Sequence, residues 1–364
     1  MQKHVNKTPI TTLEKILDFT GGERFYRFGN SDGKYWIVPA HGMRTALNLY
    51  QPSGTKGKMV KALLPCLHWL APVRKAIKAQ SVNCRLNSEL HGLLCKVFGV
   101  QDIEFAIFEG TPSVHQKITM QLSQGHRILG YCKLSTNNDI KELFEKESDT
   151  LDRLCKSGVT GIPAPLYCGT LSSGTHIFVQ STKKSASSRV IHEWGNLQDL
   201  WTTQLYEKTR QKVKFEDSDF YRSLNVLEEH LNWLPTTVDK KQIGEAITNI
   251  RNEYHGKVVE FSAHHGDFTP WNTFVEKGEL FVFDFEYTAL TYPPGLDKYH
   301  FLTQTNIFEK KGKNITHYND ITRHQHLCYL LSILSLYVNR NKGIYDSGLE
   351  NIIKSWVDTI IALK

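Results

Sequence analysis

The sequence predicts an α+β fold, with an antiparallel sheet in its first half and mostly helices in its second half. Residues 101–181 consist of short apolar segments divided by Gly-, Ser- and Pro-containing turns, which is typical of paired strands. In residues 182–257 and 323–363, apolar residues recur at helical spacing. A chain of 364 residues is long enough for two or three domains with a sizeable core.

Composition favours a soluble, reduced protein. Hydrophobic residues make up 40% and charged residues 22% of the chain, as in ordinary globular proteins. The first residues lack the apolar core of a secretion signal, and the longest apolar run, 327–338, is too short to span a bilayer. The seven cysteines are odd in number and lack paired spacing, which argues against disulfides or a zinc site. We therefore expect a cytoplasmic protein.

Positive charge is concentrated near the N-terminus. Residues 33–88 contain no Asp or Glu but nine basic residues: Lys34, Arg44, Lys56, Lys58, Lys61, Arg74, Lys75, Lys78 and Arg85. This segment dominates a predicted basic extension, residues 1–100, which precedes the strand-rich region.

The extension itself shows a predicted hairpin and helices. Residues 25–28 and 35–38 read as two strands joined by an Asn-Ser-Asp-Gly turn. Residues 59–79 predict a helix broken near Pro65 and Pro72, and residues 86–97 predict another. The basic helices have two interpretations: contact with a membrane surface or polyanion, or a helical pair packed on the protein with a solvated basic rim. The second is favoured.

Strands are predicted over residues 103–108, 116–122 and 127–135. The loop between the first two contains Gly110, Thr111 and Ser113, and it lies where a cover for nucleotide phosphates would be expected. An ordinary hairpin loop is the alternative. Two further strands follow, the second ending at Gln180.

The helix after residue 138 carries a carboxylate on its apolar face. Asp139 and Glu142 predict a capping box, and Gly158 a helix stop. Glu147 falls in the middle of the apolar stripe, where a charge is costly unless a cation meets it. Lys133, on the preceding strand, is the expected partner. In the alternative, Glu147 reaches water at the edge of the stripe.

The later helices are predicted over residues 192–210, 218–233, 239–255, 323–339 and 347–363.

Residues 258–288 contain the strongest functional signal. Asp267 lies in a polar loop, Asn272 follows five residues later, and a predicted hairpin of strands 273–275 and 280–283 delivers Asp284. Phosphoryl transfer from Mg-ATP uses such a set: one carboxylate orients the attacking hydroxyl, while an amide and a second carboxylate hold Mg²⁺. The alternative is an ordinary hairpin with surface acids.

The pattern H-G-D-x-x-x-x-N, followed by a strand ending in D-F-E, resembles the catalytic and metal-binding segments of the kinase superfamily. Its details resemble the small-molecule branch, which includes aminoglycoside phosphotransferases and choline or ethanolamine kinases. The resemblance implies a bilobal protein-kinase-like fold, with an antiparallel-sheet small lobe over residues 101–181 and a mostly helical large lobe over 182–364.

The resemblance also implies roles for individual residues. Asp267 is the expected catalytic residue, and Asn272 and Asp284 the expected Mg²⁺ ligands. The expected nucleotide-binding residues are Lys133, Glu147, Gly110, Thr111, Ser113, Gln180 and Ser181. His265 is expected to brace the loop, Glu286 to stand near the metal, and Asp297 to have a structural role at a helix N-terminus. The phosphate loop lacks G-x-G-x-x-G, so ATP is expected and GTP stays open.

Three functions remain open. The first is a kinase acting on a hydroxyl of a small molecule or glycan, such as a sugar, an amino sugar, an amino alcohol, or a lipid-linked or surface-polysaccharide sugar. The others are a protein or fructosamine-type kinase, and a non-catalytic, pseudokinase-like binding module. The basic segment 33–88 suits an anionic glycolipid or the inner membrane surface. No specific nucleic-acid partner is expected.

Overall fold

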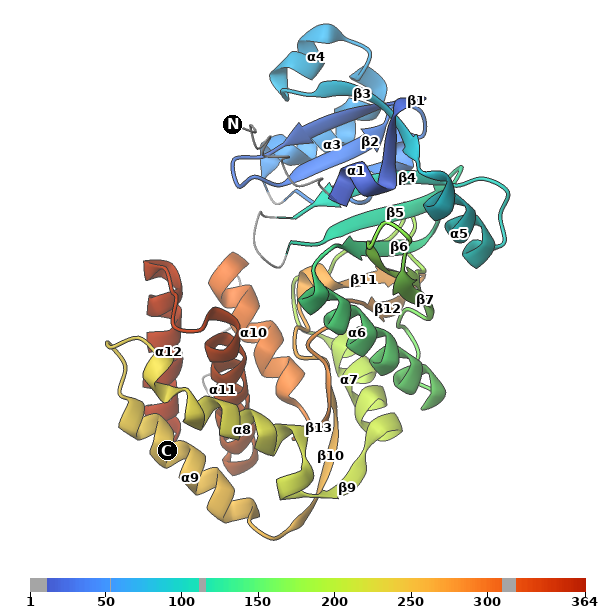
Figure 1. Cartoon of the computed structure of the whole chain (residues 1–364). Coiled ribbons are helices and arrows are strands. Elements are labelled where there is room, and N and C mark those ends of the chain that lie inside the picture. Colours follow the sequence, from blue (N-terminus) through green and yellow to red (C-terminus); the bar gives the residue numbers. More distant parts are fainter. Residues whose placement is uncertain (1–11, 53, 111–115, 310–318) are drawn as a thin grey trace, which may run out of the picture. The chain divides into compact units, whose positions relative to one another are not determined.

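The computed structural model describes residues 12–52, 54–110, 116–309 and 319–364 (Figure 1). The chain divides into two compact units: residues 1–153 with 162–189, and residues 154–161 with 190–364. The first is built on an eight-stranded sheet and the second mainly on helices, so the predicted α+β class is confirmed.

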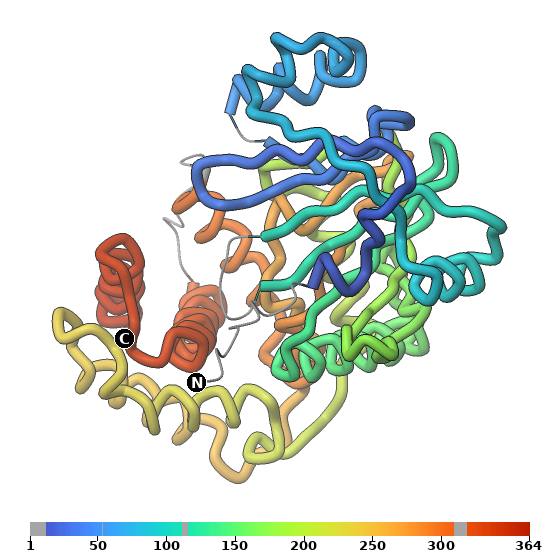
Figure 2. Tube along the Cα trace, turned by 45° about the horizontal axis from the view of Figure 1, so that its top comes forward, coloured from blue at the N-terminus to red at the C-terminus, as the bar shows by residue number. Residues whose placement is uncertain are grey.

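The sheet of the first unit has the order β3-β1-β2-β4-β5-β6-β8-β7, and every neighbouring pair is antiparallel. Its strands are β1 (Leu17–Gly29), β2 (Tyr35–Pro39), β3 (Gln80–Leu86), β4 (Glu104–Glu109), β5 (Ile118–Gln124), β6 (Arg127–Ser135), β7 (Pro165–Thr170) and β8 (His176–Ser181). The predicted β1–β2 hairpin is confirmed and is easily followed in Figure 2. Because β2 pairs with β4, strands from before and after residue 100 form one sheet.

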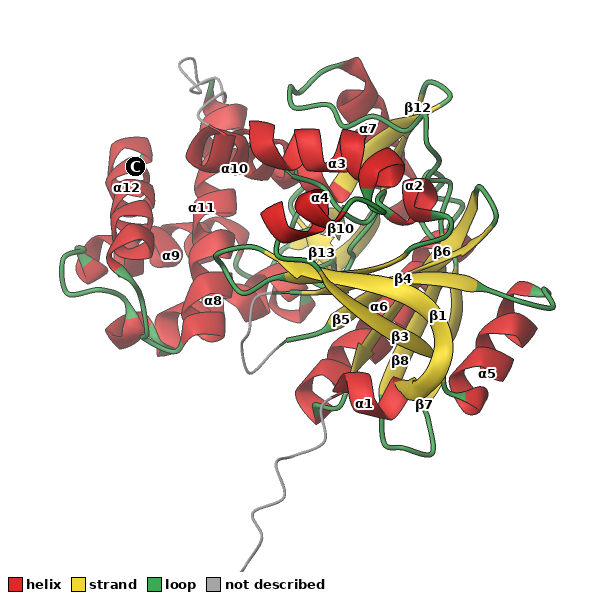
Figure 3. Cartoon of the chain, turned by 90° about the horizontal axis from the view of Figure 1, so that it is seen from above, coloured by secondary structure: helices red, strands yellow, loops and turns green. Residues whose placement is uncertain are grey.

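Helices cover both faces of this sheet (Figure 3). They are α1 (Thr12–Ile16), α2 (Met43–Ala46), α3 (Thr55–Leu67), α4 (Ala71–Ala76), α5 (Ser88–Phe98) and α6 (Asn138–Lys156). Alternating strand residues enter two separate cores: Phe25 and Ile37 join the core with α5, whereas Tyr26 and Val38 join the core with α2 and α3. This alternation is the period of two that a pleated strand imposes.

The predicted break at Pro65 and the predicted cap at Asp139 are wrong, whereas the predicted break near Pro72 is confirmed. Helix α3 continues through Pro65, because Leu64 beside it packs in the core and the proline removes only one backbone donor. Pro72 lies in the first turn of α4, where its missing N–H costs nothing. The N-cap of α6 is Asn137 rather than Asp139. The Asn137 side chain accepts a hydrogen bond from the Asp139 N–H, and the Asn137 carbonyl accepts one from the Lys141 N–H.

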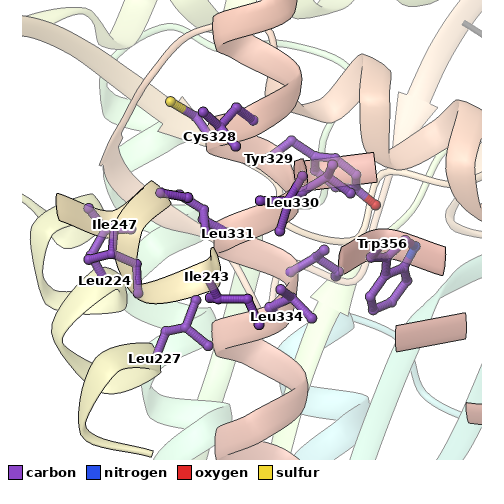
Figure 4. Packing of buried hydrophobic residues seen from close by; sticks show 14 of the residues in the cluster. Leu224, Leu227, Ile243, Ile247, Cys328, Tyr329, Leu330, Leu331, Leu334 and Trp356 are labelled. Atoms are coloured by element: carbon purple, nitrogen blue, oxygen red, sulfur yellow. The ribbon is translucent and has the colours of Figure 1, made fainter. Parts of the chain in front are cut away.

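The second unit combines a three-stranded sheet, a hairpin and long helices. The sheet is β9 (Gln211–Lys214), β10 (Val258–His264) and β13 (Ala289–Tyr292), and the hairpin is β11 (Thr273–Glu276) with β12 (Glu279–Val282). The helices are α7 (Asn196–Thr209), α8 (Asp219–Glu229), α9 (Lys240–Tyr254), α10 (Leu296–Glu309), α11 (Asp320–Asn341) and α12 (Ser347–Leu363). Side chains from α8, α9, α11 and α12 form its core; Figure 4 shows the Tyr329 hydroxyl directed away from Leu224 and Ile247.

The sequence prediction did not identify β9. Its residues, Gln211–Lys214, contain a single apolar side chain, but they pair with Val258–Phe261. The predicted helix at residue 192 begins only at Asn196, after Gly195. Among the described helices, none has the length and apolar character needed to cross a lipid bilayer.

Candidate active site

In the first unit, a buried ion pair links β6 to α6. The Lys133 ammonium lies 2.8 and 2.7 Å from the two carboxylate oxygens of Glu147. Lys133 is 5% exposed and Glu147 is 1% exposed, so each charge is compensated inside the protein rather than by water. The predicted pairing is therefore present, and the alternative in which Glu147 reaches solvent is wrong.

A row of polar side chains crosses the sheet beside this pair. Gln121, Tyr131 and Gln180 are direct partners on β5, β6 and β8, so their side chains share one face of the sheet. Each carries a buried polar atom without a hydrogen-bond partner among the described residues: Gln121 Oε1, the Tyr131 hydroxyl and Gln180 Oε1. Buried polar atoms are normally satisfied, so this row can receive a ligand with donor and acceptor atoms.

The other predicted nucleotide residues differ in their surroundings. Gly110 is half-buried, and its carbonyl accepts a hydrogen bond from Gln116 Nε2. Thr111 and Ser113 lie outside the described residues. Ser181 donates its backbone N–H to the Ala164 carbonyl and accepts the Ala164 N–H at its hydroxyl, so both groups are engaged.

In the second unit, β10 leads into the loop that carries Asp267. Asn272 Nδ2 donates to the Asp267 backbone carbonyl at 3.0 Å and to Oδ2 at 2.7 Å. His300 Nε2, on α10, lies 3.0 Å from Oδ1. Both oxygens of this carboxylate are therefore oriented by a donor. His300 was not predicted, and nothing in the local sequence pattern identifies it.

Asp297 fixes the backbone of the same loop from the first turn of α10. Its carboxylate accepts from the N–H groups of His265, at 3.0 Å, and Gly266, at 3.2 Å, and lies 2.9 Å from His264 Nδ1. Burial alone would raise the pKa of Asp297. The charge of His264 and the hydrogen bonds at the carboxylate outweigh burial and hold this pKa well below its usual value. Asp297 thus has a structural role, as predicted: it holds the backbone of His265 and Gly266.

Gly266 is required at its position in the loop. Its φ is +82°, and a Cβ there would lie 2.6 Å from the Tyr287 carbonyl oxygen. A side chain at this position would therefore be both strained and obstructed.

His265 braces the loop as a neutral imidazole, in agreement with its predicted bracing. Its Nδ1 accepts the Asp267 N–H at 3.2 Å, so the proton resides on Nε2, which donates to the Phe283 carbonyl at 3.1 Å. Burial lowers the pKa of His265 despite the nearby carboxylates of Asp297, Asp267 and Asp284.

The β11–β12 hairpin brings Asp284 beside this loop. The Phe283 N–H donates to the Asn272 carbonyl at 3.0 Å, which ties the residue before Asp284 to Asn272. Asp284 has a φ of +71°, a conformation that Asp tolerates better than most residues. Burial raises the pKa of Tyr287, and the charges of Glu286, Asp284 and Asp267 raise it further, while Arg340 opposes them.

These groups suit a hard divalent cation. The amide nitrogen of Asn272 is directed at Asp267, so its side-chain oxygen is not engaged by that carboxylate. Asp284 and Glu286 bring carboxylate oxygens within 4.8 Å of each other. Oxygen donors of this kind are those that Mg²⁺ prefers.

No protein-family model and no curated protein matches this sequence. The structure is, however, similar to solved structures of kinases that act on small molecules. Among them are aminoglycoside phosphotransferases and choline kinases, the proteins that the sequence pattern resembles.

Three of these structures illustrate the similarity. A choline kinase from Streptococcus pneumoniae is 11% identical, with 76% of this chain and 100% of that chain covered and a TM-score of 0.46. A thermostable aminoglycoside phosphotransferase mutant, in a complex with ADP and hygromycin B, is 12% identical, with 76% and 98% covered and a TM-score of 0.45. An amicoumacin kinase is 13% identical, with 71% and 86% covered and a TM-score of 0.44.

Proposed function

We propose that this chain is a phosphotransferase that moves the γ-phosphoryl group of ATP or GTP, with Mg²⁺, to a hydroxyl of a small molecule or glycan. The observation that carries the proposal is the Asp267 carboxylate, held at one oxygen by Asn272 and at the other by His300. Each oxygen retains a lone pair, so the oriented carboxylate can still accept a hydrogen bond from the hydroxyl of the substrate.

Each residue of the proposed site has its own role. Asp267 accepts the hydrogen bond of the attacking hydroxyl and takes its proton as the phosphoryl group leaves ATP. Lys133, held by Glu147, binds the α- and β-phosphates, and Asn272 and Asp284 hold Mg²⁺. An ion held there would offset the negative charge of the phosphates. Catalysis then consists mainly of positioning and charge stabilisation.

The row of Gln121, Tyr131 and Gln180 supports the proposal that the first unit binds the nucleotide. A purine base presents donor and acceptor atoms along its edge, which the orphaned Gln121 Oε1, Tyr131 hydroxyl and Gln180 Oε1 could satisfy. A carboxamide both accepts and donates, so adenine and guanine both suit this row.

The residues of α10 and α11 near Asp267 support a polyhydroxylic acceptor. Gln304 is 3% exposed and Tyr329 is 1% exposed, so both polar side chains are buried. Burial raises the pKa of Tyr337, while the charge of Arg340 lowers it. The neutral polar groups of Gln304 and Tyr329 suit the hydroxyls of a sugar.

The test is a panel of hydroxyl acceptors, incubated with labelled ATP or GTP and Mg²⁺, with products identified by mass. Wild-type protein is expected to phosphorylate at least one sugar or glycan, and Asp267→Asn to lose turnover while still binding nucleotide. Asp358→Asn, an exposed carboxylate on α12, is the control. Transfer only to peptides, or turnover unchanged in Asp267→Asn, would refute the proposal.

A further inference from the structure

Helix α3 carries exposed apolar side chains on an outer face next to the face that makes its core contacts. Leu64 is 2% exposed and packs against β1 and β2, with Val60 beside it. On the outer face, Met59 is 57% exposed and Leu63, one turn later, is 48% exposed. Such neighbouring exposed apolar side chains on one helix face are unlike the single ones scattered over most surfaces.

Trp69 extends this outer face beyond the end of α3. Its side chain is 66% exposed, and its indole N–H donates to the Cys66 carbonyl at 2.9 Å. The hydrogen bond anchors the base of the ring to the last turn of the helix. The aromatic surface is therefore presented to the surroundings in a defined position.

The charged residues in this segment of the sequence are all cations. Lys56 and Lys58 are exposed on α3, and Lys75 and Lys78 are exposed on and just after α4. No Asp or Glu occurs between residues 33 and 88, so the local sequence supplies no carboxylate to neutralise them.

We propose that this α3–α4 face, comprising Met59, Leu63, Trp69 and the four lysines, docks on an anionic lipid surface. The apolar side chains enter the boundary between headgroups and acyl chains, while the ammonium groups meet lipid phosphates. The inference is independent of the proposed function, because lipid binding needs neither nucleotide nor turnover.

Two other occupants fit this face less well. A second copy of the chain related by two-fold symmetry would bring the same patch against itself, and lysines would oppose lysines. A nucleic acid would pair with the cations, but it offers no aliphatic phase to Met59 and Leu63.

The experiment is sedimentation of the full chain with vesicles of phosphatidylcholine, with and without phosphatidylglycerol. Binding is expected only to the anionic vesicles and should weaken as salt is raised. Lys56→Gln/Lys58→Gln/Lys75→Gln and, separately, Met59→Gln/Leu63→Gln should each lower vesicle affinity by about tenfold or more. Brominated lipid should quench wild-type fluorescence more than that of Trp69→Phe.

Matched controls lie in the second unit. Ile344, which is 81% exposed, is replaced in Ile344→Gln, and the exposed lysines 212, 214 and 241 are replaced together by Gln. Both controls should bind vesicles as the wild type does. All variants are surface changes, and their thermal midpoints are compared first.

Four results would overturn the proposal. These are the absence of binding to anionic vesicles, equal losses in the control variants, a dimer without lipid that Met59→Gln/Leu63→Gln dissociates, or equally tight binding of an oligonucleotide that this variant leaves unchanged.

Discussion

His300 Nε2 donates a hydrogen bond to Asp267 Oδ1 across 3.0 Å, from a helix that begins well beyond the loop that carries Asp267. The His300 side chain is 4% exposed, and its ring packs edge-on against Tyr329. Together with Asn272 at the other oxygen, it fixes the rotation of the carboxylate. We therefore regard His300 as a positioning residue for the proposed base.

Replacing His300 is expected to lower kcat without weakening nucleotide binding. His300→Leu removes a hydrogen bond to a charged group, worth about 1.5–3 kcal/mol, which corresponds to a loss of about 10–100-fold in kcat. His300→Gln can still donate and should retain more activity. Steady-state kinetics over a range of pH check this; equal kcat in wild type and His300→Leu would contradict it.

Removing the Asp297 carboxylate should destabilise the protein as well as the loop. Asp297→Ala leaves the buried N–H groups of His265 and Gly266 without their acceptor, which costs at least about 2 kcal/mol in unfolding free energy. Asp297→Asn keeps one acceptor oxygen, so its free energy of unfolding should lie between those of the wild type and Asp297→Ala. Urea unfolding measures the difference, with Asp358→Ala as the exposed control. If Asp297→Ala lowered the free energy of unfolding no more than Asp358→Ala does, the stabilising role of Asp297 would be refuted.

The sequence was most informative where a contact follows from short-range periodicity. Glu147 was predicted to meet Lys133 because a helical stripe and the neighbouring strand define both positions, and the hairpin before Asp284 follows from its turn residues. His300 could not be predicted, because its contact with Asp267 depends on how α10 is rotated against the loop.

The same limit applies to β9 and to the row across β5, β6 and β8. Strand pairing between distant segments is set by tertiary packing, and a four-residue strand with one apolar side chain has no pattern of its own. Tyr131 and Gln121 read as ordinary strand residues until the register places them beside Gln180.

Two glycines with similar backbone angles should respond differently to alanine. Gly266 and Gly278 have φ of +82° and +87°, but a Cβ at Gly266 would meet the Tyr287 carbonyl at 2.6 Å, whereas Gly278 has open space. Gly278→Ala should cost only about 1 kcal/mol for its conformation, while Gly266→Ala should cost more and displace Asp267. Thermal unfolding and kcat of both variants test this; equal effects would count against it.

The Lys133–Glu147 pair should couple strongly in a double-mutant cycle. Lys133→Met leaves a buried, uncompensated carboxylate and should destabilise the first unit by about 3–5 kcal/mol. Lys133→Met/Glu147→Leu removes both charges and should recover much of that loss, while nucleotide binding stays absent in both variants. Chemical unfolding and nucleotide titration provide the measurements. Additive losses in stability would show that the pair is not coupled.

Acid is expected to destabilise the second unit partly through His326. Burial lowers the pKa of His326 from 6.5 to about 4, and the ring stacks on Tyr299 at a centroid distance of 4.8 Å. Between these two pH values the unfolded chain binds a proton that the folded chain does not, so stability falls as pH falls. The loss approaches about 3 kcal/mol from this group alone. His326→Phe should keep the ring stacking and flatten the dependence of unfolding free energy on pH in this window. Parallel curves for wild type and variant would mean that His326 does not contribute.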